Sequence, residues 1–487
     1  MLFNSYIFIL LFLPITLLGF FALSRLGKYK LANVYLLGMS LWFYAYFNVK
    51  YLPIIVISLF LNYLGHIGLE RVKNNQWRKA ILATVILCNA GALFYFKYFD
   101  FFLQNINVIF GTDFALRHIL LPLGISFFTF QQISFVVDSY RREVPHYSFV
   151  EYALFVTYFP QLIAGPIVSH DELIPQLLDK KTHIFNWDNF SKGVSLFALG
   201  LAKKVLIADI FGIAANWGFA NVAGLNSTEA IVTMLSYTVQ IYFDFSGYCD
   251  MAIGIGRMMN IELPVNFDSP YKSFTIVEFW SRWHKTLTRF FTKYIYIPLG
   301  GNRKGQLRTY LNTMIVFLLS GLWHGANWTF VIWGALHGAF NVISKMLKKP
   351  IEKAPKALNW LVTFVFINLT WVIFRADSMA DAVELFGNIL SFDFGGLDHN
   401  MINAFTLPEV SMLLTVLLGF DPLGKFAYLY LVVYYMVAFA LMLFFKNAKT
   451  KADTMKPTFV NSIFVAVVLV WSVLSLSGVS TFLYFNF

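Results

Sequence analysis

Residues 313–333 read TMIVFLLSGLWHGANWTFVIW and contain no Asp, Glu, Lys or Arg. A transmembrane helix needs about 20 predominantly apolar residues, and this apolar run extends across parts of two candidate spans, 309–323 and 328–344. His324 lies within it, next to Trp323 and with glycines on both sides. Aromatic packing at a membrane interface explains the tryptophan but not an imidazole at that depth. Because polar groups inside a membrane are costly and tend to be functional, His324 is the first candidate residue.

The whole chain has the composition of a membrane protein. Of its 487 residues, 58% are apolar and 13% are charged, whereas a soluble chain has about 45–50% and about 25%. A globule cannot hide this much apolar surface from water. We therefore predict an all-α polytopic membrane protein in contact with a lipid bilayer. The net charge is +11. In a membrane protein, such an excess of Lys and Arg usually lies in the cytoplasmic loops, so we expect no nucleic-acid partner.

Apolar stretches recur along the sequence. We predict about eleven to thirteen transmembrane helices within a single integral membrane domain covering residues 1–487. Shorter or mixed stretches at 250–258, 273–298 and 406–420 are predicted to be re-entrant or interfacial. The candidate spans are 5–23, 31–48, 51–68, 80–97, 116–137, 149–168, 193–218, 229–246, 309–323, 328–344, 358–374, 427–445 and 459–477.

The distribution of Lys and Arg predicts the orientation of these spans, because short cytoplasmic loops carry an excess of both. We expect both termini outside the cytoplasm, together with a loop at 98–114 and an amphipathic helix at 376–390. Residues 478–487 then form an extracytoplasmic aromatic tail. The segments placed inside by their positive residues are 25–30, 71–79, 141–142, 345–356 and 446–456.

Two more polar clusters lie in apolar surroundings. Asp244 lies in YFDFSGYCD, and Arg282 and His284 lie in FWSRWHK. Asp244 and Asp250 either serve a site or form structural ion pairs with Arg257 or Arg282. His284 lies among basic residues, so a structural helix in the headgroup region is the simpler interpretation of that histidine alone.

The residue types favour acid–base chemistry at His324. A neutral histidine, with a pKa of about 6.5, is the usual general base at physiological pH. The neighbouring glycines allow a broken helix, as ligand sites inside membranes need. The chain has no Walker A, GxGxxG, HExxH or GxSxG motif. His284, His324 and Asp244 are scattered along the sequence, so no metal site is predicted.

Several strings occur in a fixed order along the chain. Among them are LLPLGISFFTFQQISFVVDSYRR at 120–142, YFPQLIAGPI at 158–167, YFDFSGYCDMAIG at 242–254, PVNFDSPYKSFTIVEFWSRWHKTLTRF at 264–290, YIPLGGNRKG at 296–305 and GLWHGANWTFVIWGALHG at 321–338. In this order and spacing they resemble the membrane-bound O-acyltransferase (MBOAT) family. Within it, the chain is most similar to the bacterial cell-envelope branch, which includes alginate and peptidoglycan O-acetylation membrane proteins and the teichoic-acid D-alanylation membrane protein.

The resemblance implies many helices around a funnel that crosses the bacterial cytoplasmic (inner) membrane, with His324 near its narrowest point. It implies that His324 is the essential family histidine and that His284 is the second. Family members take an acyl group from a cytoplasmic thioester, so we expect acetyl-CoA as a substrate and no bound cofactor. The expected partner is a periplasmic acyltransferase that completes transfer to an envelope polysaccharide, either peptidoglycan or an alginate-like polymer.

In this interpretation, His324 takes the proton of an attacking hydroxyl as that hydroxyl meets the thioester carbonyl. A second imidazole, an amide or an indole N–H then orients groups or stabilises the oxyanion, and these alternatives stay open. An acidic partner can orient an imidazole, as in a triad. The residues expected to support catalysis in these ways are His284, Asp244, Trp323, Asn327 and Arg282.

Residues 482–487 read FLYFNF, for which an aromatic anchor at the outer interface is the simplest interpretation. The string also resembles the Tyr-containing end of the short peptide of the teichoic-acid system, which implies that Tyr484 carries the acyl group. A phenol has a pKa of about 10, so its ester stays activated relative to a sugar ester. Residues 478–484 reach at most about 23–25 Å when extended, enough to enter a cavity in a ~30 Å hydrocarbon core.

Three functions therefore compete. The first is an O-acyltransferase for an envelope polysaccharide, with acetyl favoured over D-alanyl as the acyl group. The second is a transporter or flippase for an envelope precursor, although the internal repeats typical of transporters are not seen in the sequence. The third is a scaffold that docks a periplasmic enzyme, which would leave His324 unexplained.

Overall fold

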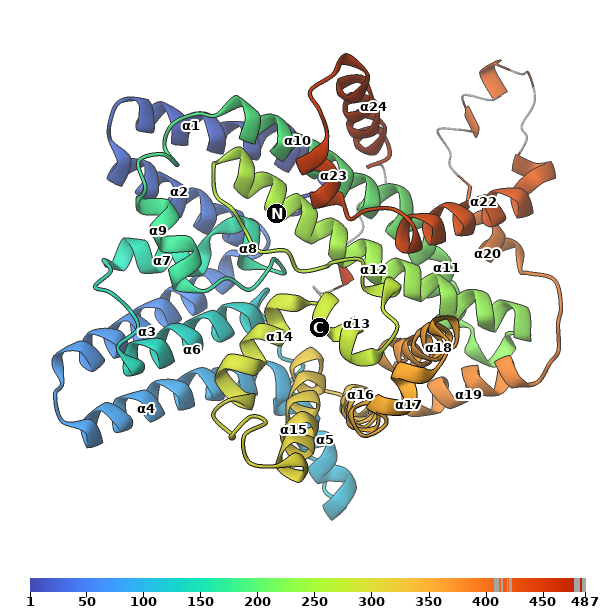
Figure 1. The fold of residues 1–487 in the computed structure, drawn as a ribbon, viewed down its shortest axis with the longest axis horizontal. Helices are drawn as coiled ribbons and strands as arrows, with labels where there is room; N and C mark the ends of the chain where they lie inside the picture. The colour runs from blue at the N-terminus through green and yellow to red at the C-terminus, as the bar shows by residue number, and fades with distance from the viewer. Residues whose placement is uncertain (407–410, 413–414, 418, 420–422, 477–481, 484–487) are drawn as a thin grey trace. The chain divides into compact units, whose positions relative to one another are not determined.

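The chain is helical, with no β-strand among the residues that the structure describes (Figure 1). This confirms the prediction of an all-α protein. The expected re-entrant stretch 406–420 lies largely outside the described residues. The computed structural model describes residues 1–406, 411–412, 415–417, 419, 423–476 and 482–483.

The chain forms two compact units that are not consecutive in sequence. Unit 1 comprises Met1–Phe197 and Cys249–Val265, and unit 2 comprises Ala198–Tyr248 and Asn266–Leu483. The helix α12 (Ser227–Met258) begins in unit 2, and its last turns belong to unit 1. All the described residues predicted for the site belong to unit 2.

In unit 1, the helices α3, α4 and α6 pack against one another (Figure 1). Local sequence sets the helix ends, as at α7, where Ser148 accepts the N–H of Glu151 and the Glu151 carboxylate accepts the N–H of Ser148. The elements are η1 (Phe8–Phe12), α1 (Leu13–Arg25), α2 (Tyr29–Ala45), η2 (Val49–Tyr51), α3 (Leu52–Arg71), α4 (Asn75–Leu93), η3 (Phe94–Tyr98), α5 (Phe99–Phe110), α6 (Ile125–Arg141), α7 (Phe149–Thr157), α8 (Phe159–Leu162), α9 (His170–Leu178) and most of α10 (Trp187–Ala202).

In unit 2, α16 packs between α15 and α18 (Figure 1). Besides the first part of α12, the elements are η4 (Lys203–Ala208), α11 (Asp209–Ala220), η5 (Val222–Gly224), η6 (Pro270–Lys272), α13 (Ile276–Arg282), α14 (Lys285–Phe291), η7 (Thr292–Tyr296), α15 (Gln306–His324), α16 (Trp328–Met346), α17 (Lys348–Lys353), α18 (Lys356–Arg375), α19 (Met379–Leu390), α20 (His399–Asn403), α22 (Leu423–Leu443), α23 (Ala448–Thr454) and α24 (Phe459–Leu474).

Several helices are suited to a membrane. Among the residues that the structure describes, four stretches are long and apolar enough to cross one, and the bent pair Ala427–Leu443 and Ala448–Thr454 would add a fifth. Many of the other expected spans fall on helices that are shorter or that bury polar side chains, so the count of eleven to thirteen and the funnel stay predictions. The four stretches are Phe8–Arg25, Val49–Arg71, Asn75–Phe110 and Lys356–Arg375.

The predicted loop at 98–114 is wrong over most of its length. The chain stays helical from Asn75 to Phe110, and α5 covers Phe99–Phe110. Asp100, which suggested a loop, lies in the first turn of α5. Its carboxylate accepts the backbone N–H groups of Arg117, at 2.9 Å, and Ile119, at 3.4 Å. The acid therefore ties a returning segment to the start of a helix.

Other boundaries also differ from the expectation. The span expected at 116–137 becomes helical only at Ile125, after Gly124 with φ +70°. The span at 149–168 is divided into α7 and α8, with Pro160 in the first turn of α8. The stretch 250–258 is not separate, because α12 continues through it. A helix expected at 376–390 is present as α19, with Leu385 buried and Val383 exposed, and its expected place on the outer surface stays a prediction.

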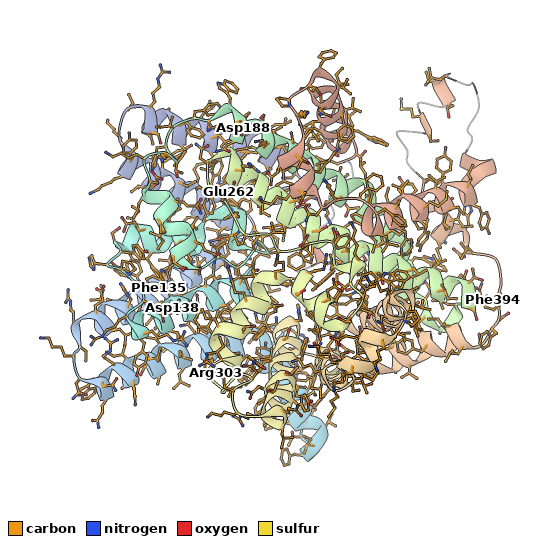
Figure 2. The ribbon with its side chains drawn as sticks, in the orientation of Figure 1. Phe135, Asp138, Asp188, Glu262, Arg303 and Phe394 are labelled. Atoms are coloured by element: carbon orange, nitrogen blue, oxygen red, sulfur yellow. The ribbon has the colours of Figure 1, made fainter. Side chains whose placement is uncertain are left out.

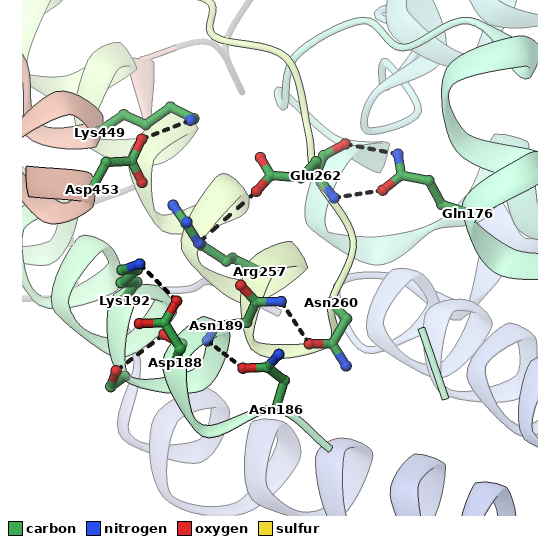
Figure 3. A network of polar contacts seen from close by, with 11 residues as sticks. Gln176, Asn186, Asp188, Asn189, Lys192, Arg257, Asn260, Glu262, Lys449 and Asp453 are labelled. Atoms are coloured by element: carbon green, nitrogen blue, oxygen red, sulfur yellow. Dashed lines mark hydrogen bonds and ion pairs between the residues drawn. The ribbon is translucent and has the colours of Figure 1, made fainter. Parts of the chain in front are cut away.

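Polar contacts hold parts of unit 1 together. On α6, the carboxylate of Asp138 is fully buried and lies 3.5 Å from the Nε2 atom of His170 (Figure 2). Near the end of α12, Glu262 and Gln176 exchange two hydrogen bonds of 2.8 and 3.0 Å (Figure 3). At the surface, Lys192 and Asp188 form an exposed ion pair of 2.6 Å. Such exposed pairs contribute little to stability.

Candidate active site

His324 lies where one helix ends and the next begins. It is the last residue of α15, and Gly325 follows it in extended backbone. A Cβ atom on Gly325 would lie 2.0 Å from the ring of Phe330, so a larger residue would displace that ring. Asn327 then caps α16 by accepting the N–H of Thr329 at 3.1 Å. The helix therefore breaks directly after His324, as the flanking glycines predicted.

Two glycines bring α15 and α16 close together. A Cβ atom on Gly321 would lie 2.2 Å from the carbonyl oxygen of Phe330, and one on Gly334 would lie 2.4 Å from that of Phe317. Only residues without a Cβ allow the two backbones to approach in this way. This contact fixes the last turn of α15, and with it His324, against α16.

The imidazole of His324 is buried among aromatic rings. Only 3% of the residue is exposed. The rings of Trp323, Trp333 and Phe374 lie 4.9, 5.3 and 5.2 Å away between centroids, each close to edge-on. Electrostatic interactions are stronger in such dry surroundings than in water. A proton acceptor placed here acts on a substrate shielded from solvent.

His284 belongs to the same aromatic cluster. It is fully buried at the N-terminus of α14, and its ring lies 4.9 Å from Phe245 and 6.0 Å from Trp323. Trp323 thus touches the rings of both predicted histidines. His284 has φ +45°, a left-handed conformation that costs a non-glycine residue about 1–3 kcal/mol and that clusters at functional sites.

Hydrogen bonds determine which nitrogen of His284 carries the proton. The Oδ1 atom of Asn266 accepts the backbone N–H of Thr286 at 3.2 Å, so this atom is an oxygen and not the amide nitrogen. The Nδ1 atom of His284 lies 3.1 Å from the same oxygen and must therefore donate. The neutral ring consequently keeps its lone pair on Nε2, which is the nitrogen able to accept a proton.

Asp244 has different partners from those expected. Its Oδ1 atom lies 2.6 Å from the Nζ atom of Lys204, and its Oδ2 atom accepts the N–H of Leu483 at 2.9 Å. Among the described residues, neither an imidazole nor an arginine is its partner. The expected pairing with Arg257 or Arg282 is therefore wrong, and the structure gives no support to a triad-like role for Asp244.

Arg282 and Asn327 have structural contacts. The Nη2 atom of Arg282 lies 2.9 Å from the Glu278 carboxylate, and Nη1 donates to the carbonyl of Asp268 at 3.3 Å. Asn327 donates from its amide to the carbonyl of Asp377 at 3.0 Å, besides capping α16. These contacts hold the loops around the histidines. Both the amide nitrogen and the amide oxygen of Asn327 take part in them.

Two residues that the sequence reasoning did not select stand close to these groups. Lys204 is 2% exposed and contacts both Asp244 and Asp209. Its position inside the apolar stretch 193–218 was a usable signal, since charges within spans are rare and functional. Trp333 is fully buried beside His324, and its indole N–H has no hydrogen-bond partner among the described residues.

A third buried histidine in unit 2, His337, is fully satisfied. Its Nδ1 atom accepts the indole N–H of Trp280 at 3.2 Å, and its Nε2 atom lies 3.0 Å from the hydroxyl of Thr370. That hydroxyl donates to the carbonyl of Ile367, so Nε2 of His337 carries the proton. Both nitrogens therefore have structural hydrogen bonds. Tyr484, the remaining predicted residue, lies outside the described residues.

A histidine buried at a helix break, in a chain with several long apolar helices, fits a membrane enzyme that uses acid–base chemistry. The family comparison agrees, because residues 118–379 match the model described as MBOAT, membrane-bound O-acyltransferase family. The chain belongs to this family, which confirms the resemblance. It is therefore an O-acyltransferase, and a transporter or a scaffold is excluded as its class.

Curated relatives cover most or all of the chain. It is 40% identical to the peptidoglycan O-acetyltransferase of Helicobacter pylori, over 100% of this chain and 98% of that protein. It is 40% identical to the probable alginate O-acetylase AlgI of Azotobacter vinelandii, over 85% and 83% of the two chains. The teichoic acid D-alanyltransferase of Streptococcus thermophilus is 26% identical, over 52% and 68%.

Proposed function

We propose that this chain takes an acetyl group from acetyl-CoA on the cytoplasmic side of the inner membrane and passes it through Tyr484 to an envelope polysaccharide. A periplasmic acyltransferase completes the transfer. The relatives that are 40% identical are named for O-acetylation of peptidoglycan and alginate, which supports acetyl over D-alanyl. The observation that carries the mechanism is the burial of His324 at the α15–α16 break, next to Trp323, whose ring also faces that of His284.

In the proposed first step, the hydroxyl of Tyr484 attacks the thioester carbonyl. Its O–H bond breaks and the proton moves to His324, while a C–O bond forms at the carbonyl carbon. The C–S bond then breaks, and the leaving thiolate takes the proton from the imidazolium. The net change converts a thioester and a phenol into an aryl ester and a thiol, with no added oxidant or cofactor.

In the proposed second step, the periplasmic partner moves the acetyl group from the phenol to a sugar hydroxyl. The C–O bond to Tyr484 breaks, a C–O bond to the sugar forms, and the sugar proton returns to the phenol. A phenol has a pKa of about 10 and is more acidic than a sugar hydroxyl. Transfer of the acetyl group from the phenol to the sugar is therefore favourable. The chain can then accept another acetyl group.

The proposed donor and relay are tested together by a labelling experiment. Membranes containing the full chain are incubated with acetyl-CoA carrying isotopic carbon in its acetyl group, and the peptide containing Tyr484 is analysed by mass spectrometry. Label on Tyr484 is the expected result. Label that reaches polysaccharide without passing through Tyr484 would contradict the relay, and labelling of Tyr484 only from another thioester would contradict the donor.

The indole N–H of Trp333 is our candidate for stabilising the oxyanion. A buried N–H without a partner is costly to a folded protein, and Trp333 lies against the ring of His324. We expect Trp333→Phe, which keeps a ring and removes the N–H, to lower kcat about 10²–10³-fold with little change in the KM for the donor. Initial rates of acetyl transfer measure both constants.

The matched control for this variant is Trp371→Phe. The Trp371 indole donates to the hydroxyl of Tyr271 at 3.0 Å, and its ring lies 5.9 Å from Trp333. Losing that bond is expected to lower thermal stability and to leave kcat per folded molecule within about twofold. If Trp333→Phe has the same kcat as the unmodified chain, the Trp333 indole does not stabilise the oxyanion.

A further inference from the structure

The ion pair of Lys204 and Asp244 is buried in unit 2. The two side chains are 2% and 3% exposed, and their charged atoms are 2.6 Å apart. The carboxylate of Asp209 lies 2.8 Å from the same ammonium. One cation thus faces two carboxylates. A buried carboxylate is tolerated only where hydrogen bonds satisfy it, so Asp244 requires a donor beyond Lys204.

Residues 482–483 supply that donor and fill the adjoining space. The N–H of Leu483 donates to the Oδ2 atom of Asp244 at 2.9 Å. The ring of Phe482 is 1% exposed and lies 4.6 Å from the Nζ atom of Lys204, within the range of a cation–π interaction. The same ring meets the Tyr248 ring edge-on at 4.7 Å. Lys204, Asp244 and Tyr248 therefore contact one backbone N–H group, that of Leu483, and one aromatic ring, that of Phe482.

The local backbone places Lys204 for this contact. It lies in the π-helical turn η4, and such turns are rare and frequent at functional sites. A Cβ atom on Gly247 would lie 2.8 Å from the carbonyl oxygen of Gly200, so the absence of a side chain allows α12 to approach the segment that carries Lys204. The ion pair depends on this approach.

The same turn of α12 also contacts the histidine cluster. Asp244 holds Leu483, and the next residue, Phe245, packs its ring 4.9 Å from that of His284. One helical turn therefore joins the residue before Tyr484 to one of the two site histidines. Tyr484 itself follows Leu483 by a single peptide bond.

We infer that Lys204, Asp244 and Tyr248 form a docking site for residues 482–483, which positions Tyr484 for acetyl transfer. The inference rests on the proposed function for the role of Tyr484, but the docking site itself can be tested without it. Lys204 and Asp244 are positioning residues in this inference, because they act through their contacts with residues 482–483 of the tail (residues 478–487). Because an undocked tail stays tethered to the chain, its loss of docking slows transfer without abolishing it.

The first test replaces both charges at once. Lys204→Met/Asp244→Leu removes both charges of the buried pair, and such apolar replacements of buried pairs are often neutral for stability. The Asp209 carboxylate loses its contact with Lys204, but its side chain is 19% exposed and stays solvated. We expect the initial rate of Tyr484 acetylation to fall about tenfold or more. The matched control is Lys192→Met/Asp188→Leu, which removes an exposed pair with the same 2.6 Å separation and is expected to leave the rate unchanged.

The second test removes only the backbone donor. Leu483→Pro has no N–H at this position, whereas Leu483→Ala keeps the N–H and removes most of the side chain. The proline variant is expected to lose about tenfold or more in the initial rate, and the alanine variant to stay within about twofold. Equal rates in the two variants would overturn the role of the Asp244 hydrogen bond.

Docking is measured separately from acetylation by the reactivity of a cysteine. Leu483→Cys is introduced into the full chain with Cys88 and Cys249 replaced by alanine, and labelling by a maleimide is followed with time. We expect slow labelling when Lys204 and Asp244 are present and at least about fivefold faster labelling in the double variant, as the segment is released. Equal labelling rates would overturn the docking site, even if Tyr484 proves to be the carrier. If Tyr484→Phe retains full acetylation, the relay is wrong, while the labelling rates still decide whether the segment docks.

Discussion

Replacing His324 with alanine is expected to reduce acetyl transfer at least about 10²–10⁴-fold, the usual contribution of a positioned general base. The imidazole is 3% exposed and enclosed by three aromatic rings, so no bulk water is at hand to take the proton in its place. The measurement is the initial rate of transfer from labelled acetyl-CoA, per folded molecule, in membranes.

The control for this variant is His337→Gln. His337 is as deeply buried, but both of its ring nitrogens have structural hydrogen bonds. We expect this variant to unfold at a lower temperature and to keep its rate per folded molecule within about threefold. Normal transfer by a folded His324→Ala chain would show that the proton leaves by another route.

Replacing Tyr484 with phenylalanine is expected to abolish O-acetylation of the polysaccharide. The variant keeps the aromatic ring and removes the hydroxyl that the proposed relay esterifies. Binding of the segment through Phe482 and Leu483 should persist, because neither contact with Lys204 or Asp244 uses the phenol. The measurement is the acetyl content of isolated polysaccharide from cells that carry the variant as their only copy.

Tyr428→Phe is the matched control for the loss of a phenol. Tyr428 lies on α22, is 54% exposed and has no part in the proposed relay. We expect polysaccharide acetylation to be unchanged in this variant. Full acetylation by Tyr484→Phe would instead leave residues 482–487 with the simpler role of an aromatic anchor.

The sequence predicted the helical course of the chain well where apolar runs were long. The runs at 309–323 and 328–344 became α15 and α16, and the break between them fell at His324. The prediction of helices from sequence failed where a charged residue lies within a helix. Asp100 suggested a loop, but its bonds to Arg117 and Ile119 depend on a returning segment that no local pattern reveals.

The sequence identified the candidate histidines of the site, but it did not reveal the contacts made by the residues around them. His324 stood out because an imidazole in apolar sequence is uncommon, whereas His284, which lies among basic residues, was selected through the family resemblance. The partner of Asp244 was not found, since Lys204 lies 40 residues away in sequence and only tertiary packing brings the two together. Asn327 suggested an oxyanion donor by type, but its position at the first turn of α16 commits its amide to capping.

The break between α15 and α16 also has an electrostatic consequence. A helix carries about half a negative elementary charge at its C-terminus and about half a positive charge at its N-terminus. α15 ends at His324 and α16 begins at Trp328, so both partial charges lie within one short turn. In the proposed reaction, the imidazole that becomes positive lies at the negative end of α15. The positive end of α16, which begins four residues further on, is placed to offset the negative charge that develops on a carbonyl oxygen.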